Sequence, residues 1–161
     1  MLRFGIATAV AGLFVSSQAH AATCEYFDVH PLGFVWTPPG GSTTWTDDDF
    51  VLEFRDTGWV PPFGPAGLVI DDVPWGQTLQ WANGMEIESI GDDITLVTFE
   101  LFVLSGTAAK VETTDTSGSG LTSTIYPPGF HQVVLQSAVP IGTIQFYDGD
   151  NETWIDKLCI Q

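Results

Sequence analysis

Short runs of apolar and β-branched residues alternate along this chain with clusters of Gly, Pro, Asn, Asp and Ser, a pattern typical of strands joined by turns. In the longest run, 94–104, apolar side chains occupy both odd and even positions. Both faces of such a strand would be apolar, so it is predicted to lie inside a sheet. The other predicted strands are 25–29, 49–55, 67–70, 85–90, 108–113, 131–136, 142–147 and 154–160.

No segment after residue 21 places its apolar residues at a helical period. Short strands without helices predict an all-β fold, an antiparallel β-sandwich of the jelly-roll kind, with a closed barrel as the alternative. The stretch 113–123, rich in Ser, Thr and Gly, is predicted to be an exposed loop.

The N-terminus has the three parts of a secretory signal. Arg3 is followed by an apolar segment, 4–15, and then by the small-x-small pattern Ala19-His20-Ala21. We expect cleavage after residue 21 and one domain over 22–161, with an N-terminal membrane anchor as the alternative. No later segment is long and apolar enough to be a transmembrane span. The expected location is extracellular or periplasmic, with association with the cell surface left open.

Two cysteines, Cys24 and Cys159, lie near the two ends of the expected mature chain. Export favours their oxidation, so we predict a disulfide that joins the first and last strands. Two buried free thiols are the alternative.

The chain has 20 acidic residues against four Lys and Arg, and a formal net charge of −16. Such a field repels nucleic acid and anionic lipid headgroups, which excludes both as partners. It attracts divalent cations, although solubility in saline surroundings accounts for many carboxylates equally well.

One carboxylate stands out in the C-terminal run. In a regular strand alternate residues share a face, so Asp156 would be buried among the apolar side chains of Trp154, Leu158 and Ile160. A buried carboxylate needs a cation or dedicated hydrogen bonds, and calcium prefers oxygen ligands. Glu25 or Asp28 could supply a second carboxylate from the first strand. The alternative places Asp156 at a sheet rim, bonded to backbone or to a base.

The pattern Glu152-x-Trp154-Ile155-Asp156-x-Leu158-x-Ile160, after the apolar run 141–146, resembles the last two strands of secreted jelly-roll modules. These include carbohydrate-binding modules and β-sandwich domains of bacterial surface proteins. The resemblance implies a structural calcium ion held by Asp156 and Glu25. A second candidate calcium site is the turn that contains Asp148, Asp150 and Glu152, which could equally be a solvated hairpin.

Aromatic residues recur in segments rich in Pro and Gly, where exposed rings could stack against sugars. Core packing is the alternative for each ring. These candidate ligand-binding residues are Trp36, Trp45, Trp59, Phe63 and Trp75.

No catalytic motif is present in the sequence, and neither His30 nor His131 lies in a recognisable nucleophile or zinc pattern. The sequence therefore predicts a secreted, non-catalytic module, stabilised by calcium, that recognises a glycan or surface polymer. One alternative is a structural subunit of a matrix, filament or surface layer that assembles with copies of itself. A second alternative is a small hydrolase or lyase acting on polysaccharides.

Overall fold

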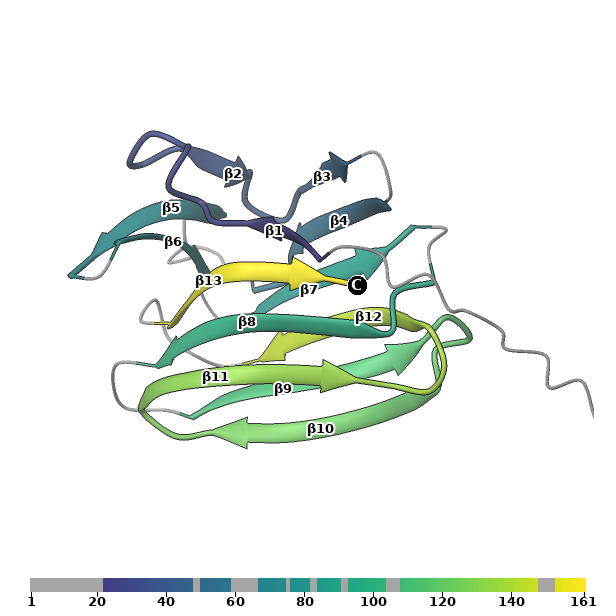
Figure 1. Ribbon diagram of the computed structural model, residues 1–161. Coiled ribbons are helices and arrows are strands. Elements are labelled where there is room, and N and C mark those ends of the chain that lie inside the picture. The colour runs from purple at the N-terminus through teal and green to yellow at the C-terminus, as the bar shows by residue number, and fades with distance from the viewer. Residues whose placement is uncertain are drawn as a thin grey trace, which may run out of the picture.

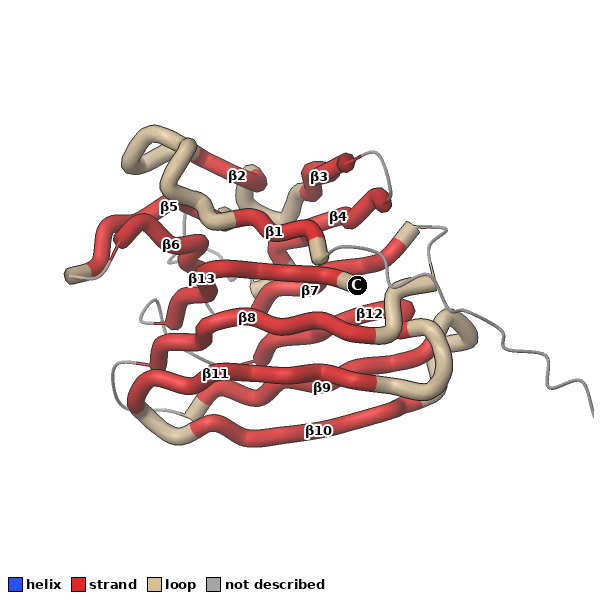
Figure 2. The backbone as a smooth tube through the Cα atoms, viewed as in Figure 1, coloured by secondary structure: helices blue, strands red, loops and turns tan. Residues whose placement is uncertain are grey.

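The computed structural model describes residues 22–47, 50–58, 67–74, 76–81, 84–90, 93–103, 108–147 and 153–161. Over these residues the secondary structure consists of strands, without a helix (Figures 1 and 2). In the same part of the chain no helix is present that could cross a membrane. The strands are β1 (Thr23–Glu25), β2 (Val35–Thr37), β3 (Ser42–Asp47), β4 (Phe50–Asp56), β5 (Leu68–Val73), β6 (Gly76–Trp81), β7 (Gly84–Ser89), β8 (Leu96–Val103), β9 (Ala109–Asp115), β10 (Gly120–Tyr126), β11 (Gly129–Gln136), β12 (Ile141–Tyr147) and β13 (Thr153–Ile160).

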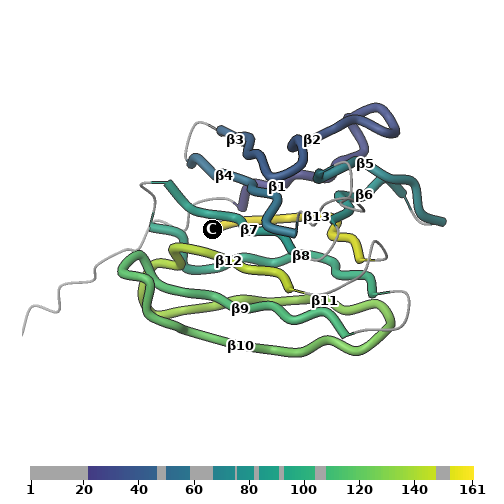
Figure 3. Tube along the Cα trace, turned by 180° about the vertical axis from the view of Figure 1, so that it is seen from behind, coloured from purple at the N-terminus to yellow at the C-terminus, as the bar shows by residue number. Residues whose placement is uncertain are grey.

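The strands form two antiparallel sheets that pack face to face. The seven-stranded sheet has the order β11-β8-β13-β6-β5-β2, with β1 also paired to β13. The six-stranded sheet has the order β10-β9-β12-β7-β4-β3 and lies nearer the viewer in Figure 3. The predicted antiparallel β-sandwich is therefore confirmed.

The eight strands from β6 to β13 have the jelly-roll order. One sheet holds the first, eighth, third and sixth of them side by side, as β6-β13-β8-β11, and the other holds the second, seventh, fourth and fifth, as β7-β12-β9-β10. This is the double Greek key of jelly rolls. The strands β2 to β5 extend both sheets beyond β6 and β7, whereas β1 pairs with the end of β13. Figure 1 shows β1 to β5 gathered at one end of the molecule.

Alternating burial explains how the sheets meet. In β4 the alternate residues Phe50, Leu52 and Phe54 are buried, and the residues between them are half-buried on the outer face. The predicted central strand is confirmed, because β8 pairs over its length with β11 and also with β13. Its inner residues, among them Phe99 and Leu101, are buried in the core between the sheets.

The two ends of the domain are joined as predicted. Cys24 and Cys159 are neighbours in the β1–β13 pair and form a disulfide. With a sequence separation of 135 residues, this bond should remove about 4–5 kcal/mol of chain entropy from the unfolded state.

Several local predictions were wrong. The stretch 113–123 is not one loop: β9 continues to Asp115, and β10 begins at Gly120 after a tight turn. Asp115 accepts hydrogen bonds from the backbone N–H groups of Ser117 and Ser119, which closes the turn. The predicted strand 25–29 ends at Glu25, because Phe27 adopts a left-handed φ of 56° and turns the chain.

Candidate functional site

The outer face of the six-stranded sheet carries an unbroken row of polar side chains. Residues that pair across neighbouring antiparallel strands point to the same face. The row follows from five successive pairings and runs Ser42, Arg55, Glu86, Gln145, Glu112 and Ser123, one residue from each strand. A second row runs beside it through Thr44, Glu53, Glu88, Thr143 and Thr114. We call these two rows the polar face.

Arg55 organises one half of the polar face. Its guanidinium is bound to Glu53 through Nε at 3.0 Å and Nη2 at 2.8 Å, and to Glu86 through Nη1 at 3.1 Å. Nη2 also lies 2.7 Å from a carboxylate oxygen of Glu88. A planar guanidinium shared by three carboxylates holds all four side chains in fixed positions.

The other half is organised by Gln145, which links Glu86 to Tyr147. Its amide N–H donates to Glu86 at 2.7 Å, while its oxygen accepts from the Tyr147 hydroxyl. Lys110 lies 2.7 Å from Glu112 and 5.3 Å from the centre of the Tyr147 ring. The Tyr147 ring is 37% exposed, so one aromatic surface stands next to the polar row.

A shallow hollow lies over the end of this face. It has a volume of about 350 Å³ and opens to solvent above β9, β10 and β12. Its polar lining includes Glu112, Ser123 and Gln145, and Leu121 contributes an apolar side chain. Ser123 donates a 2.9 Å hydrogen bond to Glu112. The hollow therefore presents hydrogen-bonding groups whose positions are already set.

The carboxyl groups of this face are built to accept hydrogen bonds. Hydrogen bonds from Arg55 and then Ser42 lower the pKa of Glu53. Hydrogen bonds from Lys110 and then Ser123 lower the pKa of Glu112. A general acid in glycoside hydrolysis needs a raised pKa instead. These two carboxylates stay ionised near neutral pH and are suited to binding hydroxyl groups.

The structure corrects one predicted platform ring. Trp36 is buried, with edge contacts to Phe27 and Phe54 at ring-centre distances of 5.5 Å, so it belongs to the core. The Trp45 ring is partly buried against the core and meets Phe50 edge-on at 4.6 Å. The predictions for Trp59, Phe63 and Trp75 lie outside the described residues.

Asp156 lies on the outer face of the other sheet, and its surroundings differ from the predicted ones. A β-bulge after Asp156, with a left-handed φ of 50° at Lys157, shifts the register of β13. Leu158 and Ile160 therefore turn into the core, whereas Asp156 stays outside with Trp154. The prediction that these four residues share one face was wrong, because a bulge reverses the alternation of a strand.

Asp156 is nevertheless 94% buried. Its pKa is raised to about 6, chiefly by withdrawal from water. The charges of Asp28 and Glu100 contribute to this rise, whereas the hydrogen bond from Lys157 N opposes it. In the antiparallel β13–β6 pair, Ile155 lies opposite Leu79. If this register continues by one residue, Asp156 lies opposite Thr78. The Thr78 hydroxyl is fully buried and has no hydrogen-bond partner.

The other predicted metal ligands are placed differently. Asp28 accepts a hydrogen bond from Gln77 N at 3.1 Å, whereas Glu25 accepts one from Phe27 N at 2.8 Å and faces His30 at 3.7 Å. Asp148, Asp150 and Glu152 lie outside the described residues. Among the residues that the structure describes, no three His, Cys, Asp or Glu side chains form a group that could hold a metal ion.

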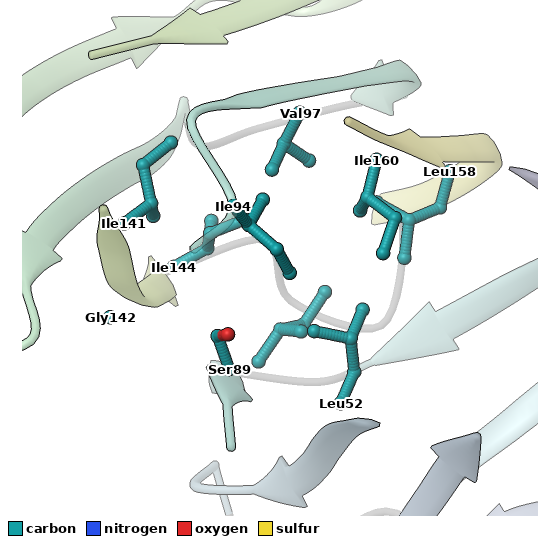
Figure 4. Close-up of a pocket in the computed structure, with 10 residues that line it drawn as sticks. Leu52, Ser89, Ile94, Val97, Ile141, Gly142, Ile144, Leu158 and Ile160 are labelled. Atoms are coloured by element: carbon teal, nitrogen blue, oxygen red, sulfur yellow. The ribbon is translucent and has the colours of Figure 1, made fainter. Parts of the chain in front are cut away.

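Between the sheets there is a small apolar cavity (Figure 4). Side chains from both sheets, including Leu52, Val97, Ile144 and Ile160, converge on a volume of about 10 Å³. This is room for one water molecule at most. The cavity is a packing defect of the core and is too small for a sugar ring.

The polar face was missed at the sequence level. Its signal is present as polar residues spaced two apart in β4, β7, β9 and β12, for example Glu86 and Glu88 or Thr143 and Gln145. Only the pairing of these strands shows that the short polar patterns join into rows.

No protein family model matches the chain, and no curated protein matches its sequence. Solved structures that resemble it include family 29 carbohydrate-binding modules. One variant module is 10% identical with a TM-score of 0.45, covering 88% of this chain and 92% of that chain. Another variant, in complex with mannohexaose, is 10% identical with a TM-score of 0.44, covering 86% and 89%.

Proposed function

We propose that this protein is a binding module that recognises a soluble or surface-bound glycan through its polar face. The observation that carries the proposal is the row of carboxylate, amide, guanidinium and hydroxyl groups that crosses six strands in register. Planar polar groups on rigid strands can bind sugar hydroxyls in pairs, and the half-exposed Tyr147 ring offers a surface for the apolar face of a sugar. Because the side chains already bond to one another, little conformational entropy is lost when a ligand binds.

The chemistry of the face favours binding over cleavage. The lowered pKa values of Glu53 and Glu112 keep both groups as acceptors. Exposed strands rather than a deep pocket suit a linear chain of sugars that lies along the sheet. We therefore propose an oligosaccharide or polysaccharide as the ligand.

The test is affinity electrophoresis and calorimetry against a panel of plain, soluble polysaccharides. Tyr147→Ala should weaken binding at least about tenfold, because stacking on an exposed ring contributes more than 1 kcal/mol in typical binding sites. Gln145→Ala should also weaken it by removing the bridge between Glu86 and Tyr147. Tyr26→Ala is the matched control, since Tyr26 is 50% exposed and lies outside the polar face. Equal binding by all three variants would contradict the proposal.

We further propose that calcium stabilises the module near Asp156. A buried carboxylate with a raised pKa, the nearby charge of Asp28 and the unpartnered Thr78 hydroxyl support this proposal. Asp156 and Asp28 would hold the ion, and calcium accepts carbonyl and water oxygens for its remaining ligands. Bound there, the cation would offset the repulsion between these carboxylates.

The test of the calcium proposal is thermal unfolding in EDTA and in millimolar calcium. Binding to the folded state alone should stabilise it by about 2.7 kcal/mol at one hundred times the dissociation constant. Asp28→Asn should reduce the shift, and an equal shift in magnesium would argue against a calcium-selective site. Glycan binding measured with and without EDTA separates this proposal from that for the polar face.

A further inference from the structure

One edge of the sandwich carries no formal charge. From 116 to 147 the chain has no Asp, Glu, Lys or Arg, although the whole chain has 20 acidic residues and a net charge of −16. This stretch contains β10, the outermost strand of the six-stranded sheet, and β11, the outermost strand of the seven-stranded sheet. Figures 1 and 3 show both strands along the same edge of the molecule. We call β10 and β11 the uncharged edge.

The β11 strand lacks the features that normally prevent edge-to-edge pairing. Proteins protect outer strands with charges, prolines or bulges. All eight residues of β11 pair with β8 in a regular register, and none of them is a proline or carries a formal charge. Two apolar side chains on its outer face, Phe130 and Val134, are 52% and 64% exposed. The free side of β11 is therefore a template for another strand.

We propose that a second copy of this chain binds at the uncharged edge, through antiparallel pairing of β11 with β11 about a two-fold axis. The charge distribution favours this partner and this place. Two copies at −16 repel each other, and that repulsion is weakest where both surfaces lack charges. The pairing would continue the seven-stranded sheet from one copy into the other.

The edge is self-complementary. Phe130 and Val134 lie two residues on either side of Gln132, on the same face of β11. With the two-fold axis at Gln132, Phe130 of one copy lies opposite Val134 of the other, and the reverse pair forms by symmetry. Aromatic side chains opposite β-branched ones are favourable cross-strand pairs. The β10 strands of the two copies come together at the same edge, and the dimer closes without exposing a new free edge there.

The test is sedimentation velocity and equilibrium on the chain from residue 22 over a wide range of concentrations. The wild-type protein should convert reversibly from monomer to dimer. Val134→Glu places a carboxylate from each copy at the interface and should weaken the dimer at least about tenfold. Gln132→Glu, which keeps the shape of the side chain, puts two like charges opposite each other on the axis and should act in the same way. High salt should restore part of the association of both variants.

The matched control is Val35→Glu. Val35 is 47% exposed and lies on β2, the outermost strand at the opposite edge of the same sheet. This variant should dimerise like the wild-type protein, and thermal melts check that all three variants fold. A wild-type monomer at every concentration would overturn the proposal, as would association that Val134→Glu and Gln132→Glu leave unchanged. The proposal would also be overturned if the wild-type protein formed assemblies larger than a dimer and Val35→Glu abolished them. Such a result would show that β2 takes part in the contact and that the copies form an open chain. The glycan-binding proposal does not depend on these outcomes.

Discussion

Replacing Asp156 by Asn tests the physical account of this buried carboxyl group most directly. The substitution keeps the shape of the side chain and an oxygen that can accept the 2.7 Å hydrogen bond from Lys157 N, but removes the charge. The pKa of Asp156 is raised from 3.8 to about 6, chiefly by burial. In the absence of a bound cation, the folded state therefore disfavours the ionised form.

The expected gain in the free energy of unfolding of Asp156→Asn follows from the linkage between protonation and folding. A rise in pKa from 3.8 to about 6 corresponds to about 3 kcal/mol at roughly 1.4 kcal/mol per pH unit. Residual screening by water reduces this value, so we expect a gain of about 1–2 kcal/mol for Asp156→Asn at pH 7 in EDTA. Because the folded state raises the pKa of an acid, the charged Asp156 destabilises the folded wild-type protein only where it ionises. This destabilisation is absent below about pH 4, grows between about pH 4 and 6, and is complete above that range.

The assay is urea unfolding of both proteins in EDTA at pH 4, 5, 6 and 7, followed by tryptophan fluorescence. The stability difference should be near zero at pH 4 and should reach its full value at pH 7. Millimolar calcium should then stabilise the wild-type protein more than Asp156→Asn. Equal stability at pH 7 in EDTA, or a less stable Asn variant, would refute the burial argument, because the charge would then cost the folded state nothing.

Three further outcomes follow from local geometry. Gly67→Ala should lower the free energy of unfolding by more than about 3 kcal/mol, because its φ is +84° and a Cβ atom would lie 1.9 Å from the backbone oxygen of Thr37. Gly118→Ala, at φ +83° with no atom near the added Cβ, should lower it by only about 1 kcal/mol in the same urea titration. Removing the disulfide by replacing Cys24 and Cys159 with Ser should cost about 4–5 kcal/mol, and an unchanged urea midpoint would contradict the chain-entropy argument. Arg55→Gln should lower the melting temperature by leaving three carboxylates to repel one another, and the loss should shrink at high salt, which differential scanning calorimetry can measure.

The sandwich and its polar face have a common origin in alternating side chains. Each strand of the six-stranded sheet buries one set of residues in the core, and the other set must face outward. Charge then decides how this outer set behaves. Arg55 and Lys110 form ion pairs with the four carboxylates of the polar face, so these side chains bond to one another rather than extend separately into water.

The features that the sequence alone determined are those with a local or compositional cause. The apolar character of both faces of 94–104 predicted the central strand β8. Two cysteines near the ends of a chain that was expected to be exported predicted the disulfide. Turn residues between short β-type runs predicted an all-β sandwich, because backbone conformation at these positions depends mainly on neighbouring residues.

The tertiary structure decided everything that depends on strand order. The polar face exists because β10, β9, β12, β7, β4 and β3 lie side by side in register, although they are scattered along the chain. Trp36, in a segment rich in Pro and Gly, became a core residue once the sheets enclosed it. The bulge at Lys157 turned Leu158 inward while Asp156 stayed outside. Non-local pairing sets each of these positions, and a single run of residues carries no record of which strand will lie beside it.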